Sequence, residues 1–150
     1  MNSMSSLDAR RLVLRNDVAE LQRLAGWLER LAQQGMSSDV SFAVQLCLEE
    51  AVANIIMYGA ARGDRLEIAV ELERNGRTLV ARIEDNGRHF DPTQVPPRSV
   101  ASSLDEASVG DVGIHLIRSF ASGMNYERLE GCNRLTLRFT ESQVSSQRPG

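Results

Sequence analysis

The chain has 150 residues, of which 42% are hydrophobic and 25% are charged. This size and composition are typical of one globular domain with its own core. The formal net charge is -3, so the chain has no general electrostatic attraction for nucleic-acid phosphates or anionic lipid surfaces. We therefore expect neither direct nucleic-acid binding nor membrane binding.

The two cysteines indicate the redox compartment. Cys47 lies in an apolar run and Cys132 in a polar turn, which is not the paired framework of a small secreted domain. Residues 1–11 lack the apolar core of a signal peptide, and no apolar stretch approaches the length of a membrane span. We expect free thiols and a cytoplasmic location.

The first half of the chain predicts one strand and two helices. A short, partly alternating strand is expected at 11–15. An amphipathic helix with Asp17 as its cap should follow over 18–33, because apolar residues recur there at helical spacing. A second helix over 40–57, capped by Ser37 or Ser38, is apolar on nearly all sides and should pack inside the domain.

The second half predicts a hairpin, a long connection and a second helix-plus-strand group. Asn75-Gly76 is a strong hairpin signal between strands. Residues 86–110 have no period and contain three prolines, so they are expected to form a lid or binding loop. The strands are expected at 66–73, 78–84, 124–129 and 134–139, and the helix at 113–121. The folded domain should cover residues 10–140, between a flexible N-terminus at 1–9 and a loose tail at 141–150.

Two polar residues stand out in the second helix. Glu50 and Asn54 are four residues apart, so they share one face of an otherwise apolar helix. Considered alone, the pair is better explained by a face that reaches solvent, where Glu50 simply bonds Asn54. Tyr58, one turn further on, is expected to pack in the core.

Two further motifs follow in the chain. Asp85-Asn-Gly87 presents a carboxylate at the end of a strand, where it can accept from a ligand's amine, although the same residues also make ordinary turns. Gly110 and Gly113 precede an apolar helical run, where free N–H groups can bind phosphate. Neither the P-loop sequence nor a dinucleotide-binding fingerprint is present.

Taken in order, the three motifs resemble the N, G1 and G2 boxes of the GHKL, or Bergerat-fold, ATPases. The resemblance is closer to the anti-sigma-factor serine kinases of bacterial partner switching, and it covers roughly residues 10–140. The segments that carry it are Glu49–Asn54, Asp85–Pro92, Val109–Arg118 and Asn133–Arg138. It implies an α+β fold, a two-layer sandwich with helices covering one face of a mixed, mostly antiparallel sheet.

The resemblance also implies roles for individual residues. Glu50 would be the general base, Asn54 would hold Mg²⁺, Asp85 would accept from the adenine amine, and Gly87 would let the base approach. The remaining ATP-binding positions would be Phe90, Gly110, Val112, Gly113 and Ile114. Asp111 and His89 stand where related proteins often have glycine, and we expect the Asp111 side chain to point outward.

The implied function is that of an ATP-dependent serine kinase acting on a separate protein, because a chain of this length has no room for a phosphoacceptor or transducer domain. On the resemblance, its substrate would be a STAS-domain anti-anti-sigma protein, its second partner a sigma factor or other regulator, and a homodimer is compatible with the family. The alternative is a non-catalytic module that uses nucleotide to control protein binding. The motifs do not separate these two functions.

Overall fold

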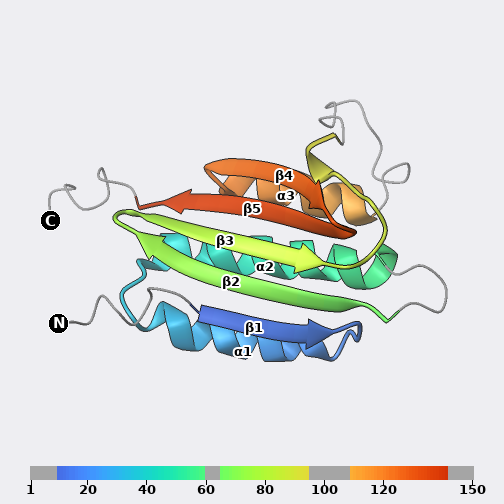
Figure 1. The fold of residues 1–150 in the computed structure, drawn as a ribbon. Helices are drawn as coiled ribbons and strands as arrows, with labels where there is room; N and C mark the ends of the chain where they lie inside the picture. The colour runs from blue at the N-terminus through green and yellow to red at the C-terminus, as the bar shows by residue number, and fades with distance from the viewer. Residues whose placement is uncertain (1–9, 60–64, 95–108, 142–150) are drawn as a thin grey trace, which may run out of the picture.

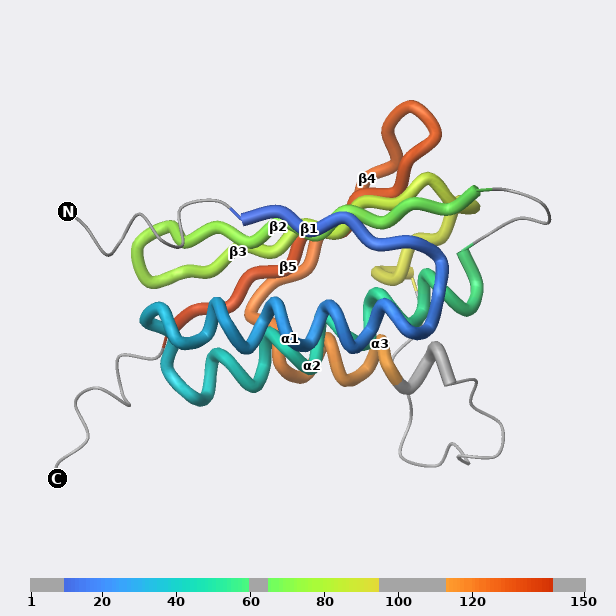
Figure 2. The backbone as a smooth tube through the Cα atoms, turned by 90° about the horizontal axis from the view of Figure 1, so that it is seen from below, coloured from blue at the N-terminus to red at the C-terminus, as the bar shows by residue number. Residues whose placement is uncertain are grey.

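In the part of the chain that the structure describes, a five-stranded sheet carries three α-helices on one of its faces (Figures 1 and 2). The computed structural model describes residues 10–59, 65–94 and 109–141, with only the backbone of 109–112. The strands are β1 (Arg10–Arg15), β2 (Glu67–Asn75), β3 (Thr78–Asp85), β4 (Gly123–Leu129) and β5 (Cys132–Thr140). The helices are α1 (Glu20–Ala32), α2 (Ser38–Tyr58) and α3 (Val109–Phe120), with a short 3-10 turn η2 (Pro92–Gln94).

The sheet has the strand order β1-β2-β3-β5-β4, and each neighbouring pair is antiparallel. The predicted hairpin is confirmed, since Asn75 pairs with Thr78 and Gly76 has a φ of 63°. The expected α+β sandwich is also confirmed, although the described strands include no parallel pair. Pairing of β3 with β5 places Asp85 opposite Asn133.

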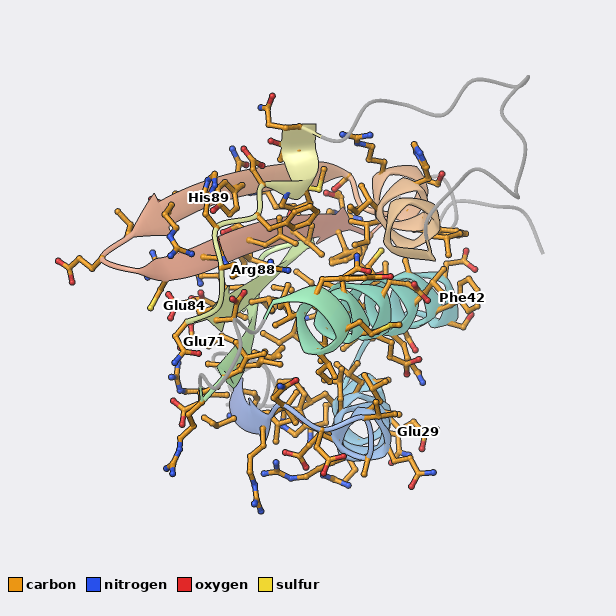
Figure 3. The ribbon with its side chains drawn as sticks, turned by 90° about the vertical axis from the view of Figure 1, so that its right-hand side faces the viewer. Glu29, Phe42, Glu71, Glu84, Arg88 and His89 are labelled. Carbon is orange, nitrogen blue, oxygen red and sulfur yellow. The ribbon has the colours of Figure 1, made fainter. Side chains whose placement is uncertain are left out.

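The core lies between the sheet and the helices. Alternate residues of β3 and β5 point toward the helices and are buried, because successive side chains of a strand point to opposite faces. Leu48 and Val52 of α2 are fully buried between these two layers. The opposite face of the sheet carries charged side chains, including Glu71 and Glu84 in Figure 3.

Helix α2 is the longest element and contributes most to the site. Ser37 is its N-cap, and the Ser37 hydroxyl accepts from the Val40 amide at 3.3 Å. By length and composition α2 could cross a membrane, so the expectation that no stretch approaches that length was wrong; in this fold it packs on the sheet. Its burial is less complete than expected, because Phe42, Met57 and Tyr58 are exposed.

Two helix starts differ from the sequence prediction. Asp17 is not the N-cap of α1, which is Ala19; instead the Asp17 side chain accepts from the Ala19 amide at 2.9 Å. Helix α3 begins at Val109 rather than near residue 113, so Gly110 and Gly113 lie within its first turns. Residues 95–108, most of the predicted lid, and the two predicted loose ends at 1–9 and 142–150 lie outside the described residues.

Candidate functional site

A cavity of ≈ 320 Å³ is lined by residues at the ends of β3 and α2. These two ends lie on the right in Figure 1. The size of the cavity is that of a small-molecule site. Most of its wall is apolar, with a few polar groups. The lining residues that bear on its chemistry are Asn54, Tyr58, Asp85, Ile114, Tyr126 and Asn133. Five elements and the connection after β3 therefore converge on one pocket.

Asp85 is the buried carboxylate of this cavity, with 5% of its surface exposed. Its Oδ1 accepts from the Gly87 amide at 2.8 Å and from Asn133 Nδ2 at 3.0 Å. Both of these bonds fall on Oδ1, so Oδ2 is the oxygen that can accept from a ligand. Burial raises the pKa of Asp85, against the opposing effects of Asn133, Gly87 and Arg128.

The fold requires glycine at position 87. A Cβ atom on Gly87 would overlap the Gly59 carbonyl oxygen just beyond α2. Arg88 stabilises this contact between the Gly87 turn and the end of α2. Its amide donates to Gly59 O at 2.7 Å, and its guanidinium donates to Tyr58 O at 2.7 Å. The turn after β3 is thereby fixed to the end of α2 (Figure 3).

Asn133 was not among the predicted site residues, yet it is the centre of the polar network beside Asp85. It is 6% exposed, and its Nδ2 also donates to Arg88 O at 2.7 Å. A sequence signal existed: Asn133 has the same strand parity as the buried Leu135 and Leu137, and a polar side chain at an inward position needs partners.

Of the two predicted polar residues of α2, Asn54 is among the residues that line the cavity and Glu50 is not. Glu50 lies one helical turn before Asn54 on α2. A Cβ atom on Gly113 would be 2.6 Å from Glu50 Oε1, so the carboxylate lies directly against α3 near its start. The Glu50 carboxylate therefore packs against the side of α3, about one turn after the start of this helix at Val109.

The other predicted positions lie in the cavity wall or near the start of α3. Ile114 is buried and lines the cavity, whereas Phe90 lines it but is 48% exposed. Gly110 and Val112 lie in the first turn of α3. The Asp111 side chain, which was expected to point outward, is outside what the structure describes.

Two of the aromatic side chains that line the cavity are Tyr58 and His89, and Tyr58 differs from expectation. Tyr58, expected in the core, is 46% exposed and lines the cavity. His89, which stands at a family glycine position, is exposed and its ring contacts Tyr126 edge-on, with ring centroids 5.8 Å apart. Both rings belong to the wall of the pocket, so they can contact a planar ligand.

The residues present fit a nucleotide with its magnesium ion. Within the described part of the chain, no group of three or more His, Cys, Asp or Glu side chains could hold a metal on its own. Mg²⁺ does not need such a cage, since it is commonly held by one or two protein oxygens together with substrate phosphates and waters. Asn54 offers one such oxygen beside the cavity.

The cavity has the buried carboxylate of Asp85 at one end and Asn54 of α2 in its wall, an arrangement that can hold a small polar ligand. Residues 14–139 match the family model of the histidine kinase-like ATPase domain. The chain is 37% identical to a protein named serine/threonine-protein kinase BtrW from Bordetella bronchiseptica, over 74% of this chain and 79% of that protein.

Two solved structures have the same fold. The RsbU and RsbW domains of Rv1364c from Mycobacterium tuberculosis align with a TM-score of 0.64 at 15% identity, over 88% of this chain and 31% of that one. The histidine kinase domain of the blue-light-activated kinase EL346 from Erythrobacter litoralis aligns with a TM-score of 0.55 at 14% identity, over 85% and 62%. This chain thus spans less than two thirds of either structure.

The chain belongs to the histidine kinase-like ATPase domain family. The resemblance to GHKL ATPases and to their protein serine kinases is confirmed by the family match and by the relative's name. An ATP-binding domain is therefore established as its coarse function.

Proposed function

We propose that this protein is a cytoplasmic protein kinase that transfers the γ-phosphate of ATP to a serine of a separate STAS-domain protein. It also binds and inhibits a second partner, a sigma factor or another regulator. The relative named as a serine/threonine-protein kinase, which aligns over most of both chains, supports the transfer reaction. The family resemblance supports the two kinds of partner.

The observation that carries the proposal is the position of Glu50 between Asn54 and Gly113. Gly59, the residue after α2, is nine positions beyond Glu50, which corresponds to a rise of about 13.5 Å along the helix. Because the Gly87 turn sits on Gly59, the Asp85 end and the Glu50 end of the site are separated along α2. This arrangement suits an adenine at Asp85 and a terminal phosphate near Glu50.

In the proposed reaction, Asp85 Oδ2 accepts from the adenine amine, and Asn54 with the start of α3 binds the magnesium phosphates. Glu50 takes the proton from the incoming serine hydroxyl. The serine oxygen forms a bond to the γ-phosphorus as the bond from that phosphorus to the bridging oxygen breaks, and ADP leaves. A well-placed base of this kind accelerates transfer by about 10²–10⁴-fold.

The test is incubation of the purified chain with γ-labelled ATP, magnesium and a candidate STAS-domain protein. Phosphoserine on the partner, dependent on both the chain and magnesium, is the expected result. Tight, nucleotide-dependent binding of the partner without phosphate transfer, across a panel of such candidates, would instead establish the non-catalytic module and overturn the kinase proposal.

A further inference from the structure

Among the described residues, five hydrogen bonds meet at the Asn133 side chain. Its Nδ2 donates to Asp85 Oδ1 and to Arg88 O. Its Oδ1 accepts from Tyr126 OH, from Arg128 Nη1 at 3.0 Å, and from the Phe90 amide at 3.3 Å. The network therefore joins β3, β4, β5 and the connection after β3.

These partners determine which way the amide faces. Asp85 and the Arg88 carbonyl offer acceptors on one side, whereas Arg128 offers only a donor on the other. A flipped amide would direct its NH₂ group at the Arg128 guanidinium and its oxygen at the Asp85 carboxylate. The orientation with Nδ2 toward Asp85 is thus fixed by the charges on both sides.

Arg128 joins this network to the turn that carries Gly87. Its Nη1 donates to Gly87 O at 2.9 Å as well as to Asn133 Oδ1. Much of the Arg128 side chain is exposed, but the groups that it contacts are buried. Arg128 on β4 therefore binds both Asn133 and the Gly87 turn. Each of these two groups donates to the same oxygen, Asp85 Oδ1.

The two carboxylate oxygens of Asp85 therefore have different roles. Oδ1 is occupied by Asn133 and Gly87, and Oδ2 remains for the ligand. Both hydrogens of Asn133 Nδ2 are already used, so this amide has no donor left for a ligand carbonyl. A base that presents an amine to this carboxylate is accepted, whereas a base that presents a carbonyl there meets an unpaired acceptor, which is costly in a buried site.

We propose that Arg128 is a positioning residue that makes the site selective for a nucleotide whose base carries an amine at the position facing Asp85. It acts through Asn133 and the Gly87 carbonyl. This inference rests on the nucleotide site of the proposed function and adds a residue that selects its base.

The experiment measures the dissociation constants of Mg-ATP and Mg-ITP, which carry an amine and a carbonyl at the same ring position, without any protein substrate. In the wild-type chain ATP should bind more tightly. Arg128→Met should weaken ATP binding by roughly three- to tenfold, while ITP binding changes little. This effect is smaller than the loss of a direct charge-assisted hydrogen bond to the ligand, because Arg128 acts on Asp85 only through Asn133 and the Gly87 turn. The ratio of the two constants should therefore fall.

Arg134→Met is the matched control. Arg134 is on the same β4–β5 hairpin, but it pairs with Glu84 and Glu127. Its replacement should leave both constants unchanged. Tyr126→Phe, which removes only one hydroxyl donor to Asn133, provides a milder variant that keeps the guanidinium and should lower the ratio by a smaller factor.

The proposal is overturned if the ratio of the two dissociation constants is unchanged in both Arg128→Met and Tyr126→Phe. This holds whether neither constant changes or both weaken equally, as they would in a generally disrupted site. The outcome is independent of phosphate transfer. Selective ATP binding by a chain that never phosphorylates a partner would remove the kinase proposal and leave the role of Arg128 standing.

Discussion

The carboxylate of Glu50 lies against Gly113, so close that a Cβ atom on this glycine would be 2.6 Å from Glu50 Oε1. Residues 63 positions apart in the chain are thus in contact between α2 and α3. A side chain at position 113 would have to displace the acid that we propose as the general base. This contact connects the glycine motif to the chemistry of the site.

Gly113→Ala should therefore lower phosphate transfer at least tenfold while the protein still folds, since the flexible end of Glu50 can move away from the new methyl group. Single-turnover transfer, with circular dichroism for folding, measures this. Gly26→Ala in α1 is the control, because its Cβ would meet only the end of Arg30 at 3.5 Å. It should keep full transfer and slightly stabilise its helix. Normal transfer by Gly113→Ala would contradict the expected displacement.

Glu50→Gln should retain Mg-ATP binding and lose transfer by at least 100-fold, because the amide keeps the size of the side chain but cannot take the serine proton. Rapid-quench single-turnover kinetics and calorimetry separate the two effects. The neighbouring Glu49→Gln is a suitable control, since Glu49 accepts from Gln45 at 3.0 Å on α2 and has no proposed chemical role. Unchanged transfer by the Glu50 variant would remove it from the base role.

Asn54→Ala should weaken ATP binding in the presence of magnesium by at least tenfold and change it little when the metal is chelated. The reason is that the proposed contact is to the ion and not to the base. Isothermal titration with and without EDTA measures the difference. Asn125→Ala, which removes an exposed partner of Arg138, should behave as wild type. Equal affinities for Mg-ATP in wild type and Asn54→Ala would exclude the metal contact.

Because of Asp85, we expect a fall in pH to have opposite effects on ATP binding and on the free energy of unfolding. Burial raises its pKa in the folded state, so the folded protein holds the proton more tightly than the unfolded chain. At pH values above the folded-state pKa, ionised Asp85 therefore lowers the free energy of unfolding. This loss of stability shrinks as the pH falls, and it is gone once the pH is below the pKa of Asp85 in the unfolded chain. ATP binding should weaken over the same fall in pH, because a protonated Asp85 no longer accepts at both oxygens.

Asp85→Asn tests this relationship. The variant removes the titrating charge, so its thermal stability at neutral pH should equal or exceed that of the wild type while ATP binding is lost. Thermal denaturation and calorimetry at neutral and acidic pH are the measurements. A variant that is less stable than the wild type at neutral pH would show that Asp85 contributes net stability through its hydrogen bonds instead.

The two thiols should react very differently. Cys47 is fully buried, and burial, with a smaller effect of Glu50, raises its pKa to about 12. Cys132 is half-buried in the β4–β5 hairpin. A thiol reagent at pH 8 should modify Cys132 in the native protein and Cys47 only after denaturation, because the thiolate is the reactive form. Cys132→Ser should then show no rapid reaction, and rapid modification of Cys47 in that variant would contradict its burial.

The sequence by itself determined the order and type of the elements, because helix and strand periods and the Asn75-Gly76 turn are read over a few neighbouring residues. It also singled out Glu50, Asn54 and Asp85, since polar groups in apolar surroundings are visible locally. The resemblance to a known family supplied their expected roles.

The tertiary structure decided which of these groups meet. Asn133 lies beside Asp85 because β3 pairs with β5, and no local pattern specifies that pairing between residues 48 positions apart. The contacts of Gly113 with Glu50 and of Gly87 with Gly59 likewise depend on how helices and sheet pack. Such contacts follow from the burial of the whole core, which is a property of all elements together and not of any short segment.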